Sequence, residues 1–325
     1  MISTARRLLA VLLLTAAAGT ACAAEDTPTT AAEPGKITLR VGDQKAGSQA
    51  LLKAAGLLEG TGYDITWSQF TSGPPLLEAV NAGAVDVGGV GNTPPVFAAA
   101  AGSKIKIVAA YRQNLAAAAI VVPDASAIAS PAQLKGKKVA VAKGSSAHYH
   151  LLSVLKKEGL SFADIQPQYL QPADALAAFS GGTVDAWAIW DPFTSQASIQ
   201  HKARLLVTGE GYVNGLNFQV AAPSAVAGKE AALRDFLTRL AKARAWSVNH
   251  KDEWAKVWAQ ETGLPQEVAD AAVANAVATP IVIDDAVVSS EQEMADAFSA
   301  EGLIPGSLKF ADFVDQRFND VVGAQ

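Results

Sequence analysis

The chain of 325 residues is poor in the side chains that bind metals and carry out redox chemistry, because it contains one cysteine and four histidines. A single cysteine excludes an intrachain disulfide, and four scattered histidines do not form the clusters that zinc or iron sites require. The glycine patterns of phosphate and dinucleotide loops are absent too, as is the Gly-x-Ser-x-Gly turn of many hydrolases. We therefore expect a protein without a metal site, a cofactor or an enzymatic activity.

Positive charge is also scarce, since 26 Lys and Arg face 31 Asp and Glu and the formal net charge is −5. Without Arg6 and Arg7, which belong to the leader described next, the remainder carries −7. Such an acidic balance argues against a nucleic-acid partner. Half of the residues are hydrophobic and 18% are charged, which predicts a globular protein with a large core. Beyond the leader no run of ~20 apolar residues is uninterrupted, so we expect no membrane-spanning helix.

Residues 1–21 have the features of an export signal peptide, in which Arg6 and Arg7 are followed by an apolar stretch and then by small residues. The apolar stretch is too short to span a bilayer by itself. Cys22 follows directly and resembles the cysteine of a bacterial lipobox. The thiol of that cysteine takes diacylglycerol, and the cysteine becomes the first residue of the mature protein. Residues 22–36 lack the apolar side chains of a core and predict a flexible tether. We expect a lipoprotein attached to the outer face of the cell membrane, the alternative being a soluble periplasmic or secreted protein.

From residue 37 onward, short β-branched runs alternate with helical segments, a pattern typical of an α/β fold with a largely parallel sheet. One stretch recurs at a constant offset and favours two similar lobes. Each copy reads as a helix, a glycine that ends it and a strand. The alternative is chance, because helix, glycine and strand follow one another in many proteins. The repeated positions, 99 residues apart, are Leu77, Ala79, Val80, Gly83, Val85 and Asp86, which recur as Leu176, Ala178, Phe179, Gly182, Val184 and Asp185.

We expect residues 37–119 and 212–325 to form lobe 1 and residues 120–211 to form lobe 2. The chain would then cross between the lobes twice. The return crossing is an analogy with two-lobed binding proteins, and it makes residues 218–222 a strand of lobe 1. Within lobe 2, a helix is expected to begin at Pro131.

The last third of the chain predicts extra helices that end at glycines or polar turns. Trp246, Trp254 and Trp258 fall at helical spacing and are expected in the core. The expected C-terminal helices span residues 229–249, 252–262, 265–277 and 290–301.

Four loops beside strand ends or helix starts are the candidate ligand contacts. Ligands of open α/β sheets bind outside the carboxyl ends of strands, where helix N-termini offer free N–H groups and a positive dipole end. Neutral donors in these loops suit a singly charged anion such as a sulfonate, which stays ionised and has three acceptor oxygens. Each loop taken alone is equally well explained as ordinary helix capping. The loops span residues 42–45, 71–75, 91–95 and 144–148, and their side-chain donors are Gln44, Ser72, Asn92, Thr93, Ser145 and Ser146.

Residues 186–193 predict a strand that leads into a new helix. Alternation along this strand puts Trp187 and Trp190 on opposite faces of the sheet. Trp190 lies nearer the carboxyl end of the strand and is expected at the cleft, where it would cover the apolar tail of a ligand. Asp191 precedes a proline and fits a helix cap, and its alternative role is to receive a ligand amine. Further candidates for apolar walls are Phe70, Tyr111 and Phe218.

These segments resemble the substrate-binding proteins of ABC importers for aliphatic sulfonates, within the wider nitrate, sulfonate and taurine group. The resemblance covers most of the chain from Leu39 onward and rests on residues 91–98, 143–148, 162–167 and 184–193. It implies a type II periplasmic-binding-protein fold, in which two doubly wound α/β lobes joined by a hinge close on the ligand. It also implies a monomeric extracytoplasmic receptor that captures an alkyl or aryl sulfonate and delivers it to an ABC permease for sulfur uptake.

By this resemblance the cleft wall would be Trp190 and Asp191, and the anion contacts would be Gln44, Gly73, Asn92, Thr93, Ser145, Ser146 and His148. Taurine, nitrate or a thiamin-pyrimidine precursor is the alternative ligand, with Asp191 as the partner of the taurine ammonium. The rival class is an enzyme that uses the helix N-termini as an oxyanion hole, with His148 and Asp191 as a dyad. The export leader and the missing catalytic motifs argue against an enzyme.

Overall fold

The computed structural model describes residues 36–322. The expected signal peptide, Cys22 and the tether up to residue 35 lie outside the described residues. Among the residues described, no helix is long and apolar enough to cross a membrane.

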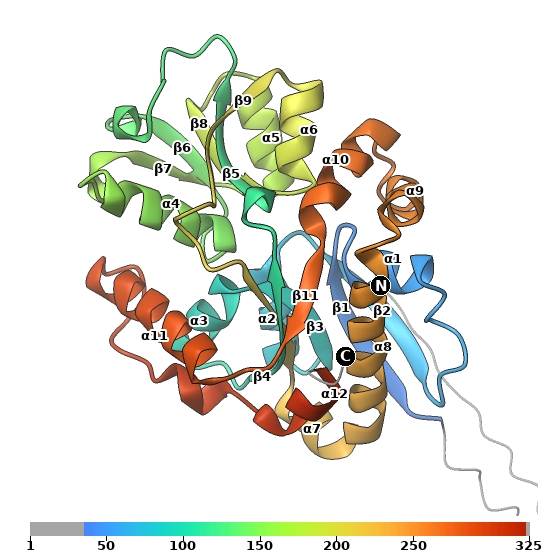
Figure 1. Cartoon of the computed structure of the whole chain (residues 1–325). Coiled ribbons are helices and arrows are strands. Elements are labelled where there is room, and N and C mark those ends of the chain that lie inside the picture. Colours follow the sequence, from blue (N-terminus) through green and yellow to red (C-terminus); the bar gives the residue numbers. More distant parts are fainter. Residues whose placement is uncertain (1–35, 323–325) are drawn as a thin grey trace, which may run out of the picture. The chain divides into compact units, whose positions relative to one another are not determined.

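Two β-sheets organise the described chain, as expected for two α/β lobes (Figure 1). We call the elements around the six-stranded sheet lobe 1 and those around the five-stranded sheet lobe 2. The sheet of lobe 1 has the order β11 (Ala278–Ile281), β4 (Lys106–Gln113), β10 (Leu216–Ala221), β3 (Val87–Gly91), β1 (Thr38–Gln44), β2 (Asp64–Phe70). The sheet of lobe 2 has the order β7 (Gln166–Tyr169), β6 (Lys138–Val141), β8 (Ala186–Trp190), β5 (Ala118–Pro123), β9 (Ala203–Thr208).

Both sheets are mixed, but four strands of each run in the same direction, in keeping with the expected α/β pattern. Strand β1 pairs in parallel with β2 and β3, and β6 pairs in parallel with β7 and β8. The remaining pairs, which involve β4, β5, β9, β10 and β11, are antiparallel. The chain path explains the reversed direction of β5 and β10, because each of these strands follows a crossing between the lobes and enters its sheet from the opposite end.

The chain passes between the sheets twice. It leaves the first sheet after β4 and reaches β5 through residues 114–117, and it returns through residues 209–215 to β10. Strand β10 then inserts between β3 and β4. The strand expected at 218–222 therefore lies at the centre of the lobe 1 sheet.

The 99-residue repeat corresponds to repeated structure. Helix α2 (Gly73–Asn81) leads through Gly83 into β3, and α5 (Pro172–Ser180) leads through Gly182 into β8. Both glycines have positive φ angles, 72° and 68°, which other residues adopt only with strain. The same helix-to-strand unit thus occurs once in each lobe.

A carboxylate occupies the same place in both copies of the repeat. Asp86 Oδ2 accepts a hydrogen bond from the backbone N of Arg40 at 2.7 Å, and Asp185 Oδ2 accepts one from the backbone N of Lys138 at 2.8 Å. Asp86 therefore connects the start of β3 to the neighbouring parallel strand β1 by a hydrogen bond, and Asp185 connects the start of β8 to β6 in the same way.

Helices cover both faces of each sheet. One apolar core cluster extends from α2 and α3 of lobe 1 to α4 of lobe 2, so the lobes share buried surface. The expected C-terminal helices are present, whereas the helix expected from Pro131 is only a 3₁₀ turn, Pro131–Leu134. The other helices are α1 (Ser48–Ala54), α3 (Thr93–Ala100), α4 (Ser146–Lys157), α6 (Phe193–Gln200), α7 (Pro223–Gly228), α8 (Glu230–Ser247), α9 (Lys251–Thr262), α10 (Gln266–Ala276), α11 (Asp285–Ala300) and α12 (Asn319–Val322).

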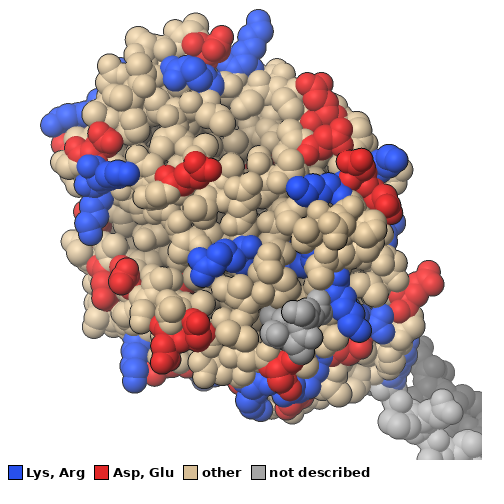
Figure 2. Space-filling view, in the orientation of Figure 1, with Lys and Arg blue, Asp and Glu red and all other residues tan. Residues whose placement is uncertain are grey.

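The face drawn in Figure 2 carries acidic and basic side chains interspersed with one another. This view shows no broad area of positive charge, in keeping with the acidic composition.

Candidate functional site

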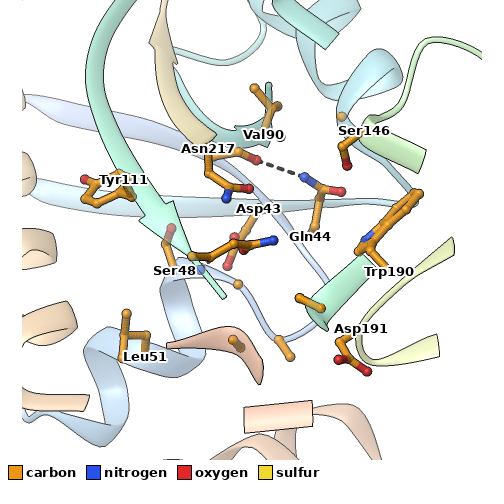
Figure 3. A pocket seen from close by; sticks show the side chains of 18 of the residues that line it. Asp43, Gln44, Ser48, Leu51, Val90, Tyr111, Ser146, Trp190, Asp191 and Asn217 are labelled. Carbon is orange, nitrogen blue, oxygen red and sulfur yellow. Dashed lines mark hydrogen bonds between the residues drawn. The ribbon is translucent and has the colours of Figure 1, made fainter. Parts of the chain in front are cut away.

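A cavity of about 160 Å³ lies where strands of both sheets end (Figure 3). Its walls include the last residues of β1, β3 and β4 from lobe 1 and of β8 from lobe 2, which is the edge at which α/β sheets bind ligands. Of the nine residues predicted as ligand contacts, six line this cavity: Gln44, Gly73, Ser145, Ser146, Trp190 and Asp191. The lining does not include Asn92, Thr93 and His148.

Gly91 and Ser146, which come from different lobes, approach each other closely in the wall of the cavity. A Cβ atom on Gly91 would lie 2.9 Å from Oγ of Ser146, so a larger residue at 91 would collide with the start of α4. The N-terminus of α2 reaches the same cavity through Gly73, and that of α3 through Pro94. These helix starts direct positive dipole ends at one place. The free N–H groups at the cavity belong to Gly73 and to the first turn of α4, because Pro74, Pro75, Pro94 and Pro95 of α2 and α3 have no N–H.

Gln44 and Ser145 are held in position by hydrogen bonds to the backbone. Nε2 of Gln44 donates to the carbonyl of Gly89 at 2.9 Å, which leaves one N–H of the amide for a ligand. Ser145 is the N-cap of α4, and its hydroxyl donates to the carbonyl of Ala142 at 2.7 Å. Ser146, the first residue of the helix, therefore supplies the hydroxyl that faces the cavity (Figure 3).

Trp190 and Asp191 form the lobe 2 wall of the cavity. Trp187 is fully buried in the core of lobe 2, whereas Trp190 is half-buried, so the two indoles separate as alternation predicts. Asp191 caps the first turn of α6, because Oδ1 accepts hydrogen bonds from N and Oγ of Ser195 at 2.9 and 2.6 Å. Burial raises the pKa of Asp191, and these bonds together with one from Asn275 oppose that rise.

Asn92 and Thr93 lie beside the cavity without lining it. Nδ2 of Asn92 donates to Oδ1 of Asn214 at 2.9 Å, and Oγ1 of Thr93 donates to Oδ1 of Asn92 at 3.0 Å. Both side chains are buried, at 3% and 0% exposure. Their bonds fix the start of α3 to the segment that returns from lobe 2. A ligand contact at Asn92 or Thr93 stays a prediction.

His148 is a core residue. It is fully buried, its Nδ1 accepts a hydrogen bond from the backbone N of Gly144 at 3.2 Å, and its ring packs among the rings of Phe97, Phe162 and Phe298. Burial and the nearby charge of Lys143 lower its pKa to about 3, so the imidazole is neutral at physiological pH. The expectation of a ligand contact at His148 is corrected, because spacing along α4 turns this side chain into the core.

Asp43 and Lys45 also line the cavity. They were not expected as ligand contacts, although both flank Gln44 in the candidate loop 42–45. Asp43 is 2% exposed, and its oxygens accept hydrogen bonds from the backbone N atoms of Ser48 and Gln49 at 2.9 and 2.8 Å. Burial raises the pKa of Asp43 to about 6, and these backbone donors limit the rise. Lys45 has an exposed side chain and also lines the cavity. The neighbouring protein atoms remove part of its hydration, which lowers its pKa.

The far end of the cavity is lined by Tyr111, Arg244, Trp254 and Trp258. Tyr111, proposed as an apolar wall, lies under the guanidinium of Arg244, whose Cζ is 4.2 Å from the ring centroid. Trp254 and Trp258 are buried as expected, but they also line the cavity. A signal for Arg244 exists in the sequence, because it lies four residues after Leu240 on the apolar face of α8.

A second, larger cavity of about 660 Å³ adjoins the first and shares the loop 43–47 with it. Its apolar walls include Phe70 from β2 and Leu176 and Phe193 from α5 and α6, so both lobes contribute. Across the described part of the chain, no group of three or more acidic, histidine or cysteine side chains is placed to hold a metal ion.

Comparisons with known proteins agree with this architecture. The model of the NMT1/THI5-like family matches residues 53–254. A protein of Escherichia coli (strain K12) named for binding aliphatic sulfonates is 38% identical over 279 residues, 85% of this chain and 88% of its own length. A protein of Bacillus subtilis (strain 168) with the same name is 34% identical over 288 residues, 86% of each chain.

Among solved structures, the alkanesulfonate-binding protein SsuA from Xanthomonas axonopodis pv. citri, bound to MOPS, is similar with a TM-score of 0.79. It is 38% identical, and the match covers 88% of this chain and 99% of that one. The two-lobed fold is thus a periplasmic-binding-protein fold. The relatives of at least 34% identity described above are binding proteins rather than enzymes. The chain belongs to the NMT1/THI5-like family.

Proposed function

We propose that this chain is an extracytoplasmic receptor that captures a small sulfonate between its two lobes and delivers it to an ABC permease for sulfur uptake. The main observation behind the proposal is the close approach of Gly91 and Ser146, because it brings helix starts from both lobes to one cavity. Hydrogen bonds to an ionised group contribute ~1.5 to 3 kcal/mol each, so three or four give most of the ~8 kcal/mol of a micromolar complex. Support also comes from the relatives, whose names refer to aliphatic sulfonates and, for the Xanthomonas protein, to a complex with the sulfonate MOPS.

The anion contacts in this proposal are Gln44, Ser146 and the backbone around Gly73 and Ser145, with Trp190 as the wall for the organic tail. An apolar wall and the adjoining larger cavity favour a ligand with a tail over nitrate, which has none. Taurine is disfavoured because the carboxylate of Asp191 is already engaged by Ser195 and Asn275.

The same proposal places the receptor on the outer face of the cell membrane, held by a lipid on Cys22 and acting as a monomer. The sequence around Cys22 supports the anchor, and the periplasmic relatives support export. Mass spectrometry of the mature N-terminus checks the anchor, and an unmodified or absent Cys22 would contradict it.

Calorimetry and thermal shift with the mature protein test the ligand. We expect methanesulfonate, butanesulfonate and benzenesulfonate to bind, and a ligand at 100 times its Kd to stabilise the protein by ~2.7 kcal/mol. Binding of nitrate or taurine without binding of any of these three sulfonates would contradict the proposal. Mass spectrometry of the incubated sulfonates completes the test, since a reaction product would show an enzyme.

A further inference from the structure

The end of the cavity away from Ser146 contains polar groups that the sulfonate contacts leave unused. We define the Arg244 subsite as Arg244 of α8, Gln219 of β10, Trp254 of α9 and Tyr111 of β4, all of which line the cavity. Figure 3 shows Tyr111 and Ser146 on opposite sides of the cavity.

Four buried polar atoms of this subsite have no hydrogen-bond partner. They are Nε of Arg244, Nε1 of Trp254, Oε1 of Gln219 and Oη of Tyr111. Gln219 is 1% exposed and Trp254 is 3% exposed, so bulk water does not solvate these side chains freely. Buried polar groups in native proteins are nearly always hydrogen-bonded, and four unsatisfied groups around one cavity indicate that a polar ligand group occupies it.

The charge of Arg244 interacts with the nearby carboxylate of Asp43, but it forms no direct ion pair and so can still bind a ligand. Within residues 36–322, no ion pair at 4 Å or less involves its guanidinium, which rests on the ring of Tyr111. The two carboxylates that line the cavity, Asp43 and Asp191, accept hydrogen bonds from Ser48, Gln49, Ser195 and Asn275. Arginine and an indole N–H together favour a carboxylate, whose two oxygens accept from a guanidinium fork.

The distance between this subsite and the sulfonate contacts can be estimated from two glycines of β3, Gly89 and Gly91, because one lies at each end of the cavity. A Cβ on Gly89 would meet Nε2 of Gln219 at 2.8 Å, and a Cβ on Gly91 would meet Oγ of Ser146 at 2.9 Å. Residues two apart on a strand face the same side and lie ~7 Å apart, so the two ends of the cavity are separated by about the length of a short carbon chain. The amide of Gln219 presents either its oxygen or its nitrogen to this space by rotation.

We propose that the Arg244 subsite binds a second anionic group, a carboxylate, at the far end of a short-chain sulfonate whose sulfonate lies at Ser146. The inference rests on the proposed function and narrows it, because it makes sulfocarboxylates the preferred class. A sulfonate with an apolar end of the same length leaves Arg244 and Trp254 without partners.

Calorimetry with 3-sulfopropanoate and 1-propanesulfonate tests this preference, because the two ligands share a sulfonate and a three-carbon chain. We expect the wild-type protein to bind 3-sulfopropanoate at least tenfold more tightly. Arg244→Met should bring the two Kd values within about threefold of each other and leave the Kd of 1-propanesulfonate nearly unchanged. That unchanged Kd also reports that the variant is folded.

Trp254→Phe gives a second variant that keeps the packed ring and removes only the unpartnered N–H, and it should reduce the preference by about threefold. Lys45→Met is the matched control, since it removes another cation of the same cavity, and it should keep the preference. Equal affinities in the wild-type protein, or a preference that Lys45→Met abolishes and Arg244→Met retains, would overturn the inference while sulfonate binding stands. Failure of both ligands to bind would instead contradict the proposed function, and the inference with it.

Discussion

Asn275 of α10 donates a hydrogen bond from Nδ2 to Oδ2 of Asp191, 3.0 Å away, and so joins the C-terminal helices to the β8–α6 turn of lobe 2. The same carboxylate caps the first turn of α6 through Ser195. One side chain thereby orders the wall of the cavity and links it to an element outside its own lobe.

Replacing Asn275 by Ala should therefore weaken sulfonate binding. A hydrogen bond to a charged acceptor contributes ~1.5 to 3 kcal/mol, so we expect an increase in Kd of roughly tenfold, measured by calorimetry. Gln266→Ala is the control, because this residue of α10 bonds only to the exposed Asp270 and should leave the Kd unchanged. An unchanged Kd in Asn275→Ala would show that the bond does not contribute to the binding-competent arrangement.

Substitutions at Ser146 should weaken every sulfonate, whatever its tail. Ser146→Ala removes the hydroxyl that faces the cavity and should raise Kd about tenfold, and Ser146→Pro also removes a backbone donor at the helix start. Ser153→Ala, further along α4 and outside the cavity lining, is the matched control. Equal affinities of Ser146→Ala and the wild-type protein would argue against this helix start as the anion site.

Trp190→Ala should discriminate between ligands by tail length. The indole lines the cavity, and covering an apolar tail contributes about 25 cal/mol per Å² of buried surface. We expect octanesulfonate to lose at least tenfold in affinity and methanesulfonate much less, as compared by calorimetry. Equal losses for both ligands would refute the assignment of Trp190 to the tail.

Glu291 should make the protein less stable as the pH rises. It is fully buried, Oε1 accepts a hydrogen bond from Asn214 at 2.7 Å, and burial raises its pKa to about 8. In the unfolded chain the carboxyl ionises near its ordinary pKa of 4.5, so the folded state binds more protons between pH 4.5 and 8. This contribution to stability is fully present below pH 4.5 and is lost as the pH rises through 8.

The measurement is the free energy of unfolding between pH 6.5 and 8. Burial lowers the pKa values of His148 and His150 to about 3 and 4, so both side chains are neutral in the folded state over this interval. Glu291→Gln should remove a decrease of up to about 2 kcal/mol over this interval. Glu293→Gln, at an exposed position of α11, should retain the decrease. A pH profile that Glu291→Gln does not alter would show that the carboxyl is ionised in the folded protein.

Local signals in the sequence were sufficient for much of the fold. Glycine stops such as Gly83 and Gly182, and alternation around Trp187, correctly predicted helix ends and a buried strand. Strand β2 has the sequence DITWSQF and lies at a sheet edge, where polar residues weaken the apolar pattern, and it was not expected. The helix expected after Pro131 ends within one turn, before Gly136 with its φ of 74°.

Some residues of the candidate site could be predicted from local sequence signals, and others could not. Gln44, Ser146 and Trp190 were predictable because each lies at a strand end or a helix start, and such positions meet at one edge of a sheet. Asn92 and His148 sit in the same kind of loop or first turn, yet their side chains turn towards Asn214 and the aromatic core. Neighbours that decide a rotamer come from distant parts of the chain, so a loop sequence alone does not show which side chains face the ligand.

The sequence by itself determined that the chain forms two α/β units with helix starts rich in neutral donors, because those features depend on residues a few positions apart. Only the tertiary structure decided that Arg244 of α8 shares a cavity with Asp43 of β1, some 200 residues earlier, and with Ser146 of the other lobe. The reason is that strand order, chain crossings and the packing of C-terminal helices bring these groups together, and such long-range contacts leave no periodic pattern in the sequence.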